Sequence, residues 1–206
     1  SDGINWTRAT TAAGWGSRAG HTALVFNNKM WIMGGYEGPK NDFHDVWYST
    51  DGVNWTQATA SAGWNKRRYF TSLIFNNKMW IMGGGDYYCH EYNDVWYSTD
   101  GVNWTQATAS AGWKEREGHA SFVFDNKMWV MGGGDCAFSS YNDVWYSTDG
   151  VNWTQVTANA SWIERRDPGF VVYRNKMWII GGTNVDGYEG GPLHDVWYSS
   201  SDIWNP

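Results

Sequence analysis

The chain has 206 residues, a formal net charge of −6, 25 Gly and 17 Trp, a composition that favours short strands and turns over helices. The acidic balance argues against a nucleic-acid partner, because phosphate backbones are bound by clustered Lys and Arg, which are here interleaved with Asp and Glu. No apolar run approaches the roughly 20 residues of a membrane-spanning helix.

A short strand is predicted at residues 4–8, and a repeat of 49 residues dominates the chain after it. The phrase Asp-Val-Trp-Tyr-Ser begins at Asp45, Asp94, Asp143 and Asp195. The phrase Asn-Lys-Met-Trp begins at Asn28, Asn77, Asn126 and Asn175. Sixteen of the 17 Trp fall into four repeated slots, so architecture explains most of them before any function is considered.

Each repeat is predicted to form four short antiparallel strands, a to d, which in the second repeat cover residues 70–75, 78–82, 94–98 and 102–107. Asn76-Asn77 and Thr99-Asp100-Gly101 are typical of tight hairpin turns. A sheet this small cannot bury its faces alone, so the repeats are expected to pack around an axis as propeller blades. The blades are predicted at about residues 18–58, 67–107, 116–157 and 165–200 of a single domain.

Closure of the ring is expected to involve the N-terminal strand. Residues 4–8 read as a strand d, and the last complete strand, at residues 195–199, reads as a strand c. Pairing these two would close a four-bladed monomer and cover an open edge. Residues 202–204 compete for the same place. Two chains joined in a larger ring, or a piece of a longer protein, are the alternatives.

The Gly-Gly pairs that end strand b, followed by Asp-Val and a Trp, resemble the kelch repeat, as found in kelch propellers and in the propeller domain of galactose oxidase. The pairs begin at Gly34, Gly83, Gly132 and Gly181. The resemblance implies an all-β, four-bladed kelch-like propeller, although four blades is fewer than kelch propellers usually have. The Ser-Thr-Asp-Gly-x-x-Trp turn also resembles a shortened Asp-box of sialidase-like propellers, where it is usually structural.

The d–a and b–c connections lie on one face, here called the loop face, and they are the long and variable ones; binding is expected there. Each d–a connection contains Trp-x-x-Arg, in the pairs Trp15/Arg18, Trp64/Arg67, Trp113/Arg116 and Trp162/Arg165. These residues precede the innermost strand, so they are predicted to line the channel mouth and bind a glycan or an acidic group. Alternatively, each Arg pairs with the Asp of an Asp-Val motif and each Trp covers a gap between blades.

The b–c loops supply the other predicted ligand-binding residues, Tyr87, Tyr88 and His90. An acidic and aromatic rim suits a glycan, or a peptide about as well. The function predicted is therefore a secreted or cell-surface, non-enzymatic binding module. The alternative, which kelch domains often represent, is a protein–protein scaffold that docks a peptide or partner domain on the same face.

Cys89 and Cys136 lie in the b–c loops of adjacent blades, and a disulfide between them is predicted, which would imply an oxidising compartment. Two free thiols, or a metal site with His90, are the alternatives. No cofactor is expected beyond an ion or water on the central axis.

Enzymatic activity is not predicted, because the chain has no nucleophile elbow, P-loop or paired-carboxylate motif. A copper oxidase is disfavoured because His21 and His119 recur in a slot that holds Phe70 and Pro168 in the other blades. A sialidase is disfavoured because no local motif ties its Arg and Tyr residues together.

Overall fold

The computed structural model describes residues 2–185 and 190–199, which contain strands and turns and no helix. The first sheet consists of β1 (Thr22–Phe26), β2 (Lys29–Met33), β3 (Val46–Ser49) and β4 (Thr56–Thr59). The second consists of β5 (Thr71–Phe75), β6 (Lys78–Met82), β7 (Val95–Ser98) and β8 (Thr105–Thr108). The third consists of β9 (Ala120–Phe124), β10 (Lys127–Met131), β11 (Val144–Ser147) and β12 (Thr154–Thr157). The fourth consists of β13 (Gly169–Tyr173), β14 (Lys176–Thr183) and β15 (Pro192–Tyr198).

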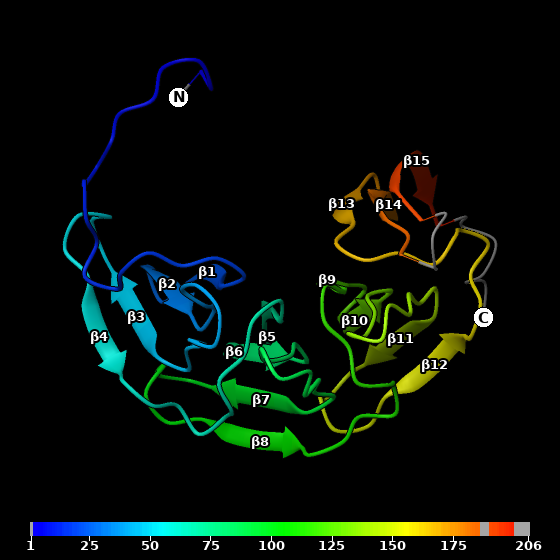
Figure 1. Ribbon diagram of the computed structural model, residues 1–206, viewed down its shortest axis with the longest axis horizontal. Coiled ribbons are helices and arrows are strands. Elements are labelled where there is room, and N and C mark those ends of the chain that lie inside the picture. Colours follow the sequence, from blue (N-terminus) through cyan, green and yellow to red (C-terminus); the bar gives the residue numbers. More distant parts are fainter. Residues whose placement is uncertain (1, 186–189, 200–206) are drawn as a thin grey trace.

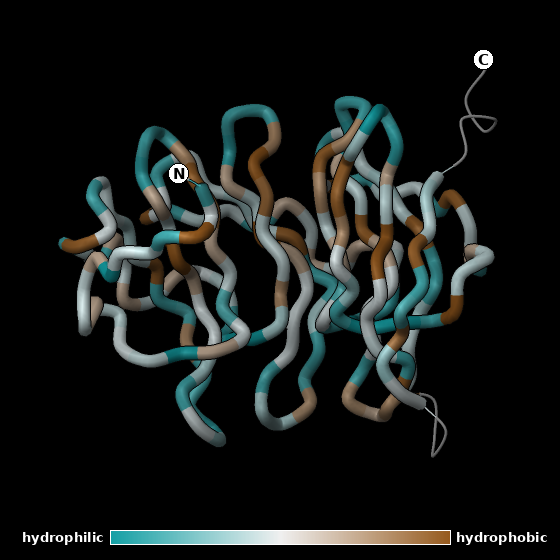
Figure 2. Tube along the Cα trace, turned by 90° about the horizontal axis from the view of Figure 1, so that it is seen from above, coloured by the Kyte–Doolittle hydropathy of each residue, from teal (hydrophilic) through white to brown (hydrophobic). Residues whose placement is uncertain are grey.

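The four antiparallel sheets are arranged as the blades of a propeller (Figure 1), which confirms the predicted fold class. The strands β1, β5, β9 and β13 lie innermost, and β1 contacts β5, β5 contacts β9 and β9 contacts β13. Seen edge-on, the strands cross the thickness of the ring, with mostly hydrophilic turns at its rims (Figure 2). The described residues contain no helix that is long and apolar enough to cross a membrane.

The hairpin turns follow directly from residue choice. Asn27 and Asn28, between β1 and β2, both have positive φ, 48° and 57°, and Asn76 and Asn77 repeat this between β5 and β6. Two consecutive positive φ values define the type I′ turn, and Asn tolerates them better than most residues. The a–b turn is therefore encoded locally in each blade.

The c–d turn is held by one Asp in every complete blade. In the second blade, Asp100 Oδ1 accepts the backbone N–H groups of Val102 and Asn103, both at 2.8 Å. Its Oδ2 accepts the Asn103 side-chain amide, also at 2.8 Å. Partial burial opposes ionisation of Asp100, but these hydrogen bonds outweigh it and lower its pKa to about 2.

The blades pack through large aromatic side chains that meet the turn of the next blade. The Trp31 indole, from the first blade, is 3% exposed and lies against Gly101 in the second, where an added Cβ would be 2.1 Å from the Trp31 ring. Trp80 lies against Gly150 of the third blade in the same way, with 2.2 Å for the added Cβ. The first two interfaces between successive blades therefore repeat one arrangement.

The predicted closure of the ring is not formed. Residues 4–8 are not a strand, Trp6 is 88% exposed, and the fourth sheet has three strands within the described part of the chain. The four blades span only part of a circle, and a gap separates the first blade from the fourth (Figure 1). The N-terminal segment consequently extends away from β15 instead of pairing with it. The competing residues 202–204 lie outside the described part of the chain.

Candidate functional site

The four Arg residues of the Trp-x-x-Arg motif are buried braces. Arg67 is 0% exposed, and its two terminal nitrogens donate to the two carboxylate oxygens of Asp94 at 2.7 and 2.9 Å. Arg67 Nη1 also donates to the Gly83 carbonyl at 2.8 Å. The same pairing recurs in each blade, as Arg18–Asp45, Arg67–Asp94, Arg116–Asp143 and Arg165–Asp195.

These pairs contradict the prediction that Arg18, Arg67, Arg116 and Arg165 bind a ligand. The planar guanidinium of each Arg forms a bidentate pair with a carboxylate of the same blade. The two terminal nitrogens that would bind an anion are therefore already bonded to that carboxylate. The alternative considered for these residues, pairing with the Asp of Asp-Val, is the observed one. The ring of Arg is scaffold.

The Trp residues of the same motif also belong to the scaffold. Trp64 and Trp113 are each 1% exposed, and both pack edge-to-face on the strand-d Trp of the blade that follows. Trp162 is buried and Trp15 is half-buried. The structure therefore contradicts ligand contact by Trp64, Trp113 and Trp162, because they fill the gaps between blades.

The channel mouth is lined one and two positions further along the chain. A series of backbone hydrogen bonds links the four blades there: the Tyr69 N–H donates to the Gly20 carbonyl at 2.9 Å, the Gly118 N–H to the Tyr69 carbonyl at 2.9 Å, and the Asp167 N–H to the Gly118 carbonyl at 2.7 Å. The residues before them in the chain are Ala19, Arg68, Glu117 and Arg166. The mouth is thus formed by side chains that the sequence analysis did not assign to the site.

Both Arg residues at the mouth are already paired with carboxylates from a neighbouring blade. Arg68 Nε lies 2.6 Å from Asp42 Oδ1, and Arg166 Nη2 lies 2.7 Å from Glu117 Oε1. Burial raises the pKa of Glu117, and it raises that of Asp167 as well. Each Arg at the mouth is therefore balanced by a carboxylate, and Arg68 Nη2 is left without a hydrogen-bond partner.

An aromatic group, here called the tyrosine cluster, consists of Tyr36, Tyr69, Tyr87 and Tyr88 and lies on the loop face of the first two blades. The Tyr36 and Tyr69 hydroxyls are 3.0 Å apart, and this hydrogen bond raises the pKa of Tyr69 to about 12. The guanidinium of Arg68 lies 4.0 Å from the ring centre of Tyr36 and 5.8 Å from that of Tyr87. One cation thus joins the aromatic rings of two blades.

The exposed part of the cluster contains two of the predicted site residues, Tyr87 and Tyr88, and a third, His90, lies beside it. Tyr87 and Tyr88 pack edge-to-face at 5.4 Å, and Tyr88 lies 6.4 Å from the His90 ring. Tyr88 is 63% exposed, and Tyr87 is partly exposed as well. The structure therefore brings Tyr87, Tyr88 and His90 together on the surface. The signal for Arg68, which follows Arg67 directly, was present in the sequence but was not separable from that of its buried neighbour.

One cavity, of about 870 Å³, is a mostly apolar groove between the third and fourth blades. Its lining includes Trp129, Trp162 and Trp197. The counterparts of Trp129 in the first and second blades, Trp31 and Trp80, are covered by the c–d turn of the next blade. The matching segment of the fourth blade lies beyond residue 199, outside the described residues. The groove therefore marks an interface between blades and provides no argument for a ligand site.

His119 is a buried residue that directly precedes β9. Its Nε2 lies 2.8 Å from the Thr71 hydroxyl, and burial, with the nearby Arg116 charge, lowers its pKa to about 3. An unfolded His has a pKa near 6.5, so the unfolded chain binds the extra proton between these two values. Stability contributed by neutral His119 is complete above about pH 6.5 and decreases as the pH falls.

The His119→Phe variant is expected to remove this pH dependence, because Phe70 occupies the same slot in the second blade. Between about pH 6.5 and 5, the free energy of unfolding of the wild type should fall with a slope approaching 1.4 kcal/mol per pH unit more than that of the variant. Urea unfolding at a series of pH values measures both. Equal slopes would show that His119 is not held neutral.

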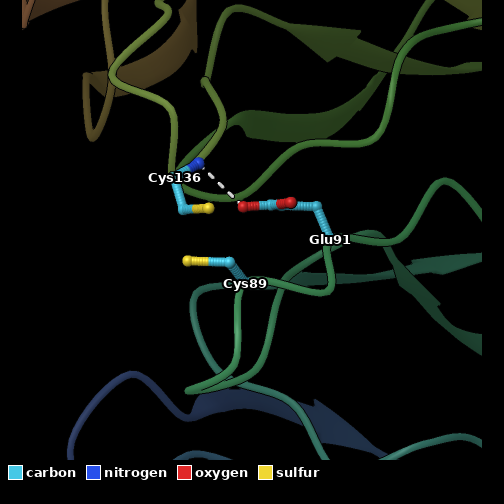
Figure 3. A group of neighbouring side chains, drawn as sticks. All are labelled: Cys89, Glu91 and Cys136. Atoms are coloured by element: carbon cyan, nitrogen blue, oxygen red, sulfur yellow. Dashed lines mark hydrogen bonds between the residues drawn. The ribbon is translucent and has the colours of Figure 1, made fainter.

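The two cysteines meet across adjacent blades, but the predicted disulfide is not formed and both thiols are free. The third residue beside them is Glu91, not His90 as one alternative proposed (Figure 3).

The four blades, the Gly-Gly strand ends and the Arg–Asp braces together define a kelch-type propeller.

The chain belongs to the kelch-repeat family, because the model of the KLHDC2/KLHL20/DRC7 Kelch-repeats domain matches residues 3–182. Among solved structures, one described as "Structure of YjhT" is similar, with a TM-score of 0.76 and 13% sequence identity. The similarity covers 90% of this chain and 69% of that one, and at this identity it shows the fold alone. A comparison with curated proteins found no match.

Proposed function

We propose that this chain is a non-enzymatic interaction scaffold whose loop face docks a peptide segment of a partner protein on the tyrosine cluster. The observation that carries the proposal is the exposed aromatic surface of Tyr87, Tyr88 and His90, backed by Arg68. Tyr and Arg are enriched where protein interfaces concentrate their binding energy, because they combine apolar area with hydrogen-bonding groups. Kelch-repeat membership supports an interaction scaffold in the same way.

The charges of the mouth favour a peptide over an acidic small molecule. The four buried Arg are bound to Asp residues, and the two Arg at the mouth are bound to Asp42 and Glu117. A free anion would compete with these carboxylates for the guanidinium groups, although Arg68 Nη2 has no hydrogen-bond partner. An amphipathic aromatic surface requires no such competition, because peptide side chains can stack on the rings while backbone groups bond the hydroxyls.

The test is a selection from a displayed library of random peptides against the wild-type chain, followed by binding to the Tyr87→Ala/Tyr88→Ala double variant. The matched control is Tyr173→Ala, which removes an exposed Tyr beside the a–b turn on the opposite face. Selected peptides are expected to bind the wild type and the control, and to lose at least about tenfold in affinity for the double variant, as for an interface hot spot. A glycan array run in parallel would contradict the proposal if saccharides bound through the same tyrosines and no peptide was enriched.

A further inference from the structure

The repeat places two particular loop positions of adjacent blades beside each other. One position is the apex of the b–c loop, occupied by Lys40, Cys89 and Phe138 in successive blades, each with left-handed backbone at φ of 67°, 65° and 63°. The other, in the following blade, is occupied by Tyr87 and Cys136. At the first junction the Lys40 amine lies 5.7 Å from the Tyr87 ring centre. At the second junction both positions hold Cys, so the scaffold brings two thiols together.

A third position is placed by a hydrogen bond that also recurs. Asp42 Oδ2 accepts the backbone N–H of Tyr87 at 3.0 Å, Glu91 Oε1 accepts that of Cys136 at 2.7 Å, and Ser140 Oγ accepts that of Val185 at 3.3 Å. The acceptor is therefore built into every junction between successive blades. At the second junction it is a carboxylate that is anchored by one oxygen and directed at the two thiols (Figure 3).

We propose that Cys89, Cys136 and Glu91 form a binding site for a thiophilic divalent cation of the zinc class. One ligand atom from each residue lies within 4.8 Å of the other two. Around Zn²⁺, with bonds of about 2.3 Å to sulfur and about 2.0 Å to oxygen, neighbouring ligands of a tetrahedron are roughly 3.3–3.8 Å apart. Small rotations of the side chains would bring the three atoms to that spacing, and water would occupy the fourth position.

Binding would replace two thiol protons by one cation. The two sulfurs and the Glu91 carboxylate coordinate the metal ion, and the two S–H protons pass to solvent. The net charge of the site is therefore −1 both without the metal ion and with it. A +2 ion is therefore exactly offset by the two lost protons. The bound ion would join the b–c loops of the second and third blades and fix the loop that carries Tyr87, Tyr88 and His90.

The experiment is calorimetric titration of the reduced chain with Zn²⁺ in two buffers of different ionisation enthalpy, together with Cd²⁺ titration followed by ultraviolet thiolate charge transfer. One ion per chain, release of up to two protons and a charge-transfer band are expected, and Cys136→Ser and Cys89→Ser should each abolish the band. Glu91→Gln, whose amide oxygen can still accept the Cys136 N–H, should weaken Zn²⁺ binding at least about tenfold. His90→Ala is the matched control and should bind as the wild type does.

Two results would overturn the proposal. The first is the absence of stoichiometric Zn²⁺ binding by a chain whose two thiols are shown to be free by thiol titration. The second is loss of binding in His90→Ala with full binding in Glu91→Gln, which would replace the proposed third ligand. Thermal unfolding of each variant in the presence of a chelator should match the wild type, since Cys89 is exposed and Cys136 only half-buried. The readout depends on these loops alone, so it is independent of whether the tyrosine cluster binds a peptide.

Discussion

Arg116→Ala is expected to lower the free energy of unfolding by about 3–5 kcal/mol, because it leaves the Asp143 carboxylate without its partner in a largely buried place. Arg116 donates to Asp143 at 2.6 and 2.7 Å, to the Gly132 carbonyl at 2.7 Å and to the Lys114 carbonyl at 3.1 Å, so four acceptor atoms would lose this donor at once. Of these, Asp143 Oδ2 would keep another donor, Trp145 Nε1 at 2.8 Å. Urea unfolding measures the change. Arg8→Ala, which removes an exposed Arg from the N-terminal segment, is the control and should be neutral.

A double-mutant cycle separates the pair from its surroundings. If Arg116 acts through Asp143, then Asp143→Asn should be less harmful in the Arg116→Ala background than in the wild type, with a coupling of about 1 kcal/mol or more. Additive effects in this cycle, or an Arg116→Ala chain as stable as the wild type, would show that the buried pair does not brace the blade.

Gly101→Ala is expected to cost about 2–4 kcal/mol, and Gly3→Ala about 1 kcal/mol. The two glycines occupy equivalent positions in two similar turns, with φ of 78° and 71°. Each substitution therefore places an L-residue in a left-handed conformation. They differ in their neighbours: a Cβ on Gly101 would lie 2.1 Å from the Trp31 ring, whereas nothing lies within 4 Å of one on Gly3. The difference between the two variants therefore contains the Trp31 contact, together with any backbone strain that the exposed N-terminal segment relieves locally.

Thermal or urea unfolding of both variants gives that difference directly. Equal destabilisation by the two substitutions would contradict the account in two ways: it would mean either that the Trp31 contact contributes nothing, or that the turn at Gly3 packs against another blade and closes the ring. The Trp31→Ala substitution in the Gly101→Ala background resolves the two, since it should relieve the clash only if the contact exists.

The sequence predicts the blades well because each depends on local signals. Asn27-Asn28 encodes its turn through tolerated positive φ, and the Asp100–Asn103 hydrogen bonds close the c–d turn without help from other blades. The number of blades in a ring is different, because it follows from the angle between neighbours. That angle arises from contacts between blades, such as Trp31 against Gly101, and these contacts cannot be read from the sequence of a single repeat. Ring closure through residues 4–8 was accordingly predicted wrongly.

The site was predicted in part, and the error has a physical origin. Trp-x-x-Arg gathers on the loop face as predicted, but whether Arg67 or Arg68 lies at the channel mouth depends on which one meets Asp94 in the folded blade. The two residues are identical and adjacent, so spacing cannot distinguish them. Tyr87, Tyr88 and His90 lie in an exposed variable loop, as expected for such a loop on a rigid scaffold, and their role in binding stays a prediction. The secreted or surface location, the monomer and the ion on the axis stay predictions.

The most direct test of the tyrosine cluster as the binding surface is calorimetric titration of one selected peptide into three chains: the wild type, Tyr88→Ala and Tyr173→Ala. The account predicts a loss of at least about tenfold in affinity for Tyr88→Ala and an unchanged affinity for Tyr173→Ala. Binding that is unaffected by Tyr88→Ala, in a chain that unfolds at the wild-type temperature, would contradict it.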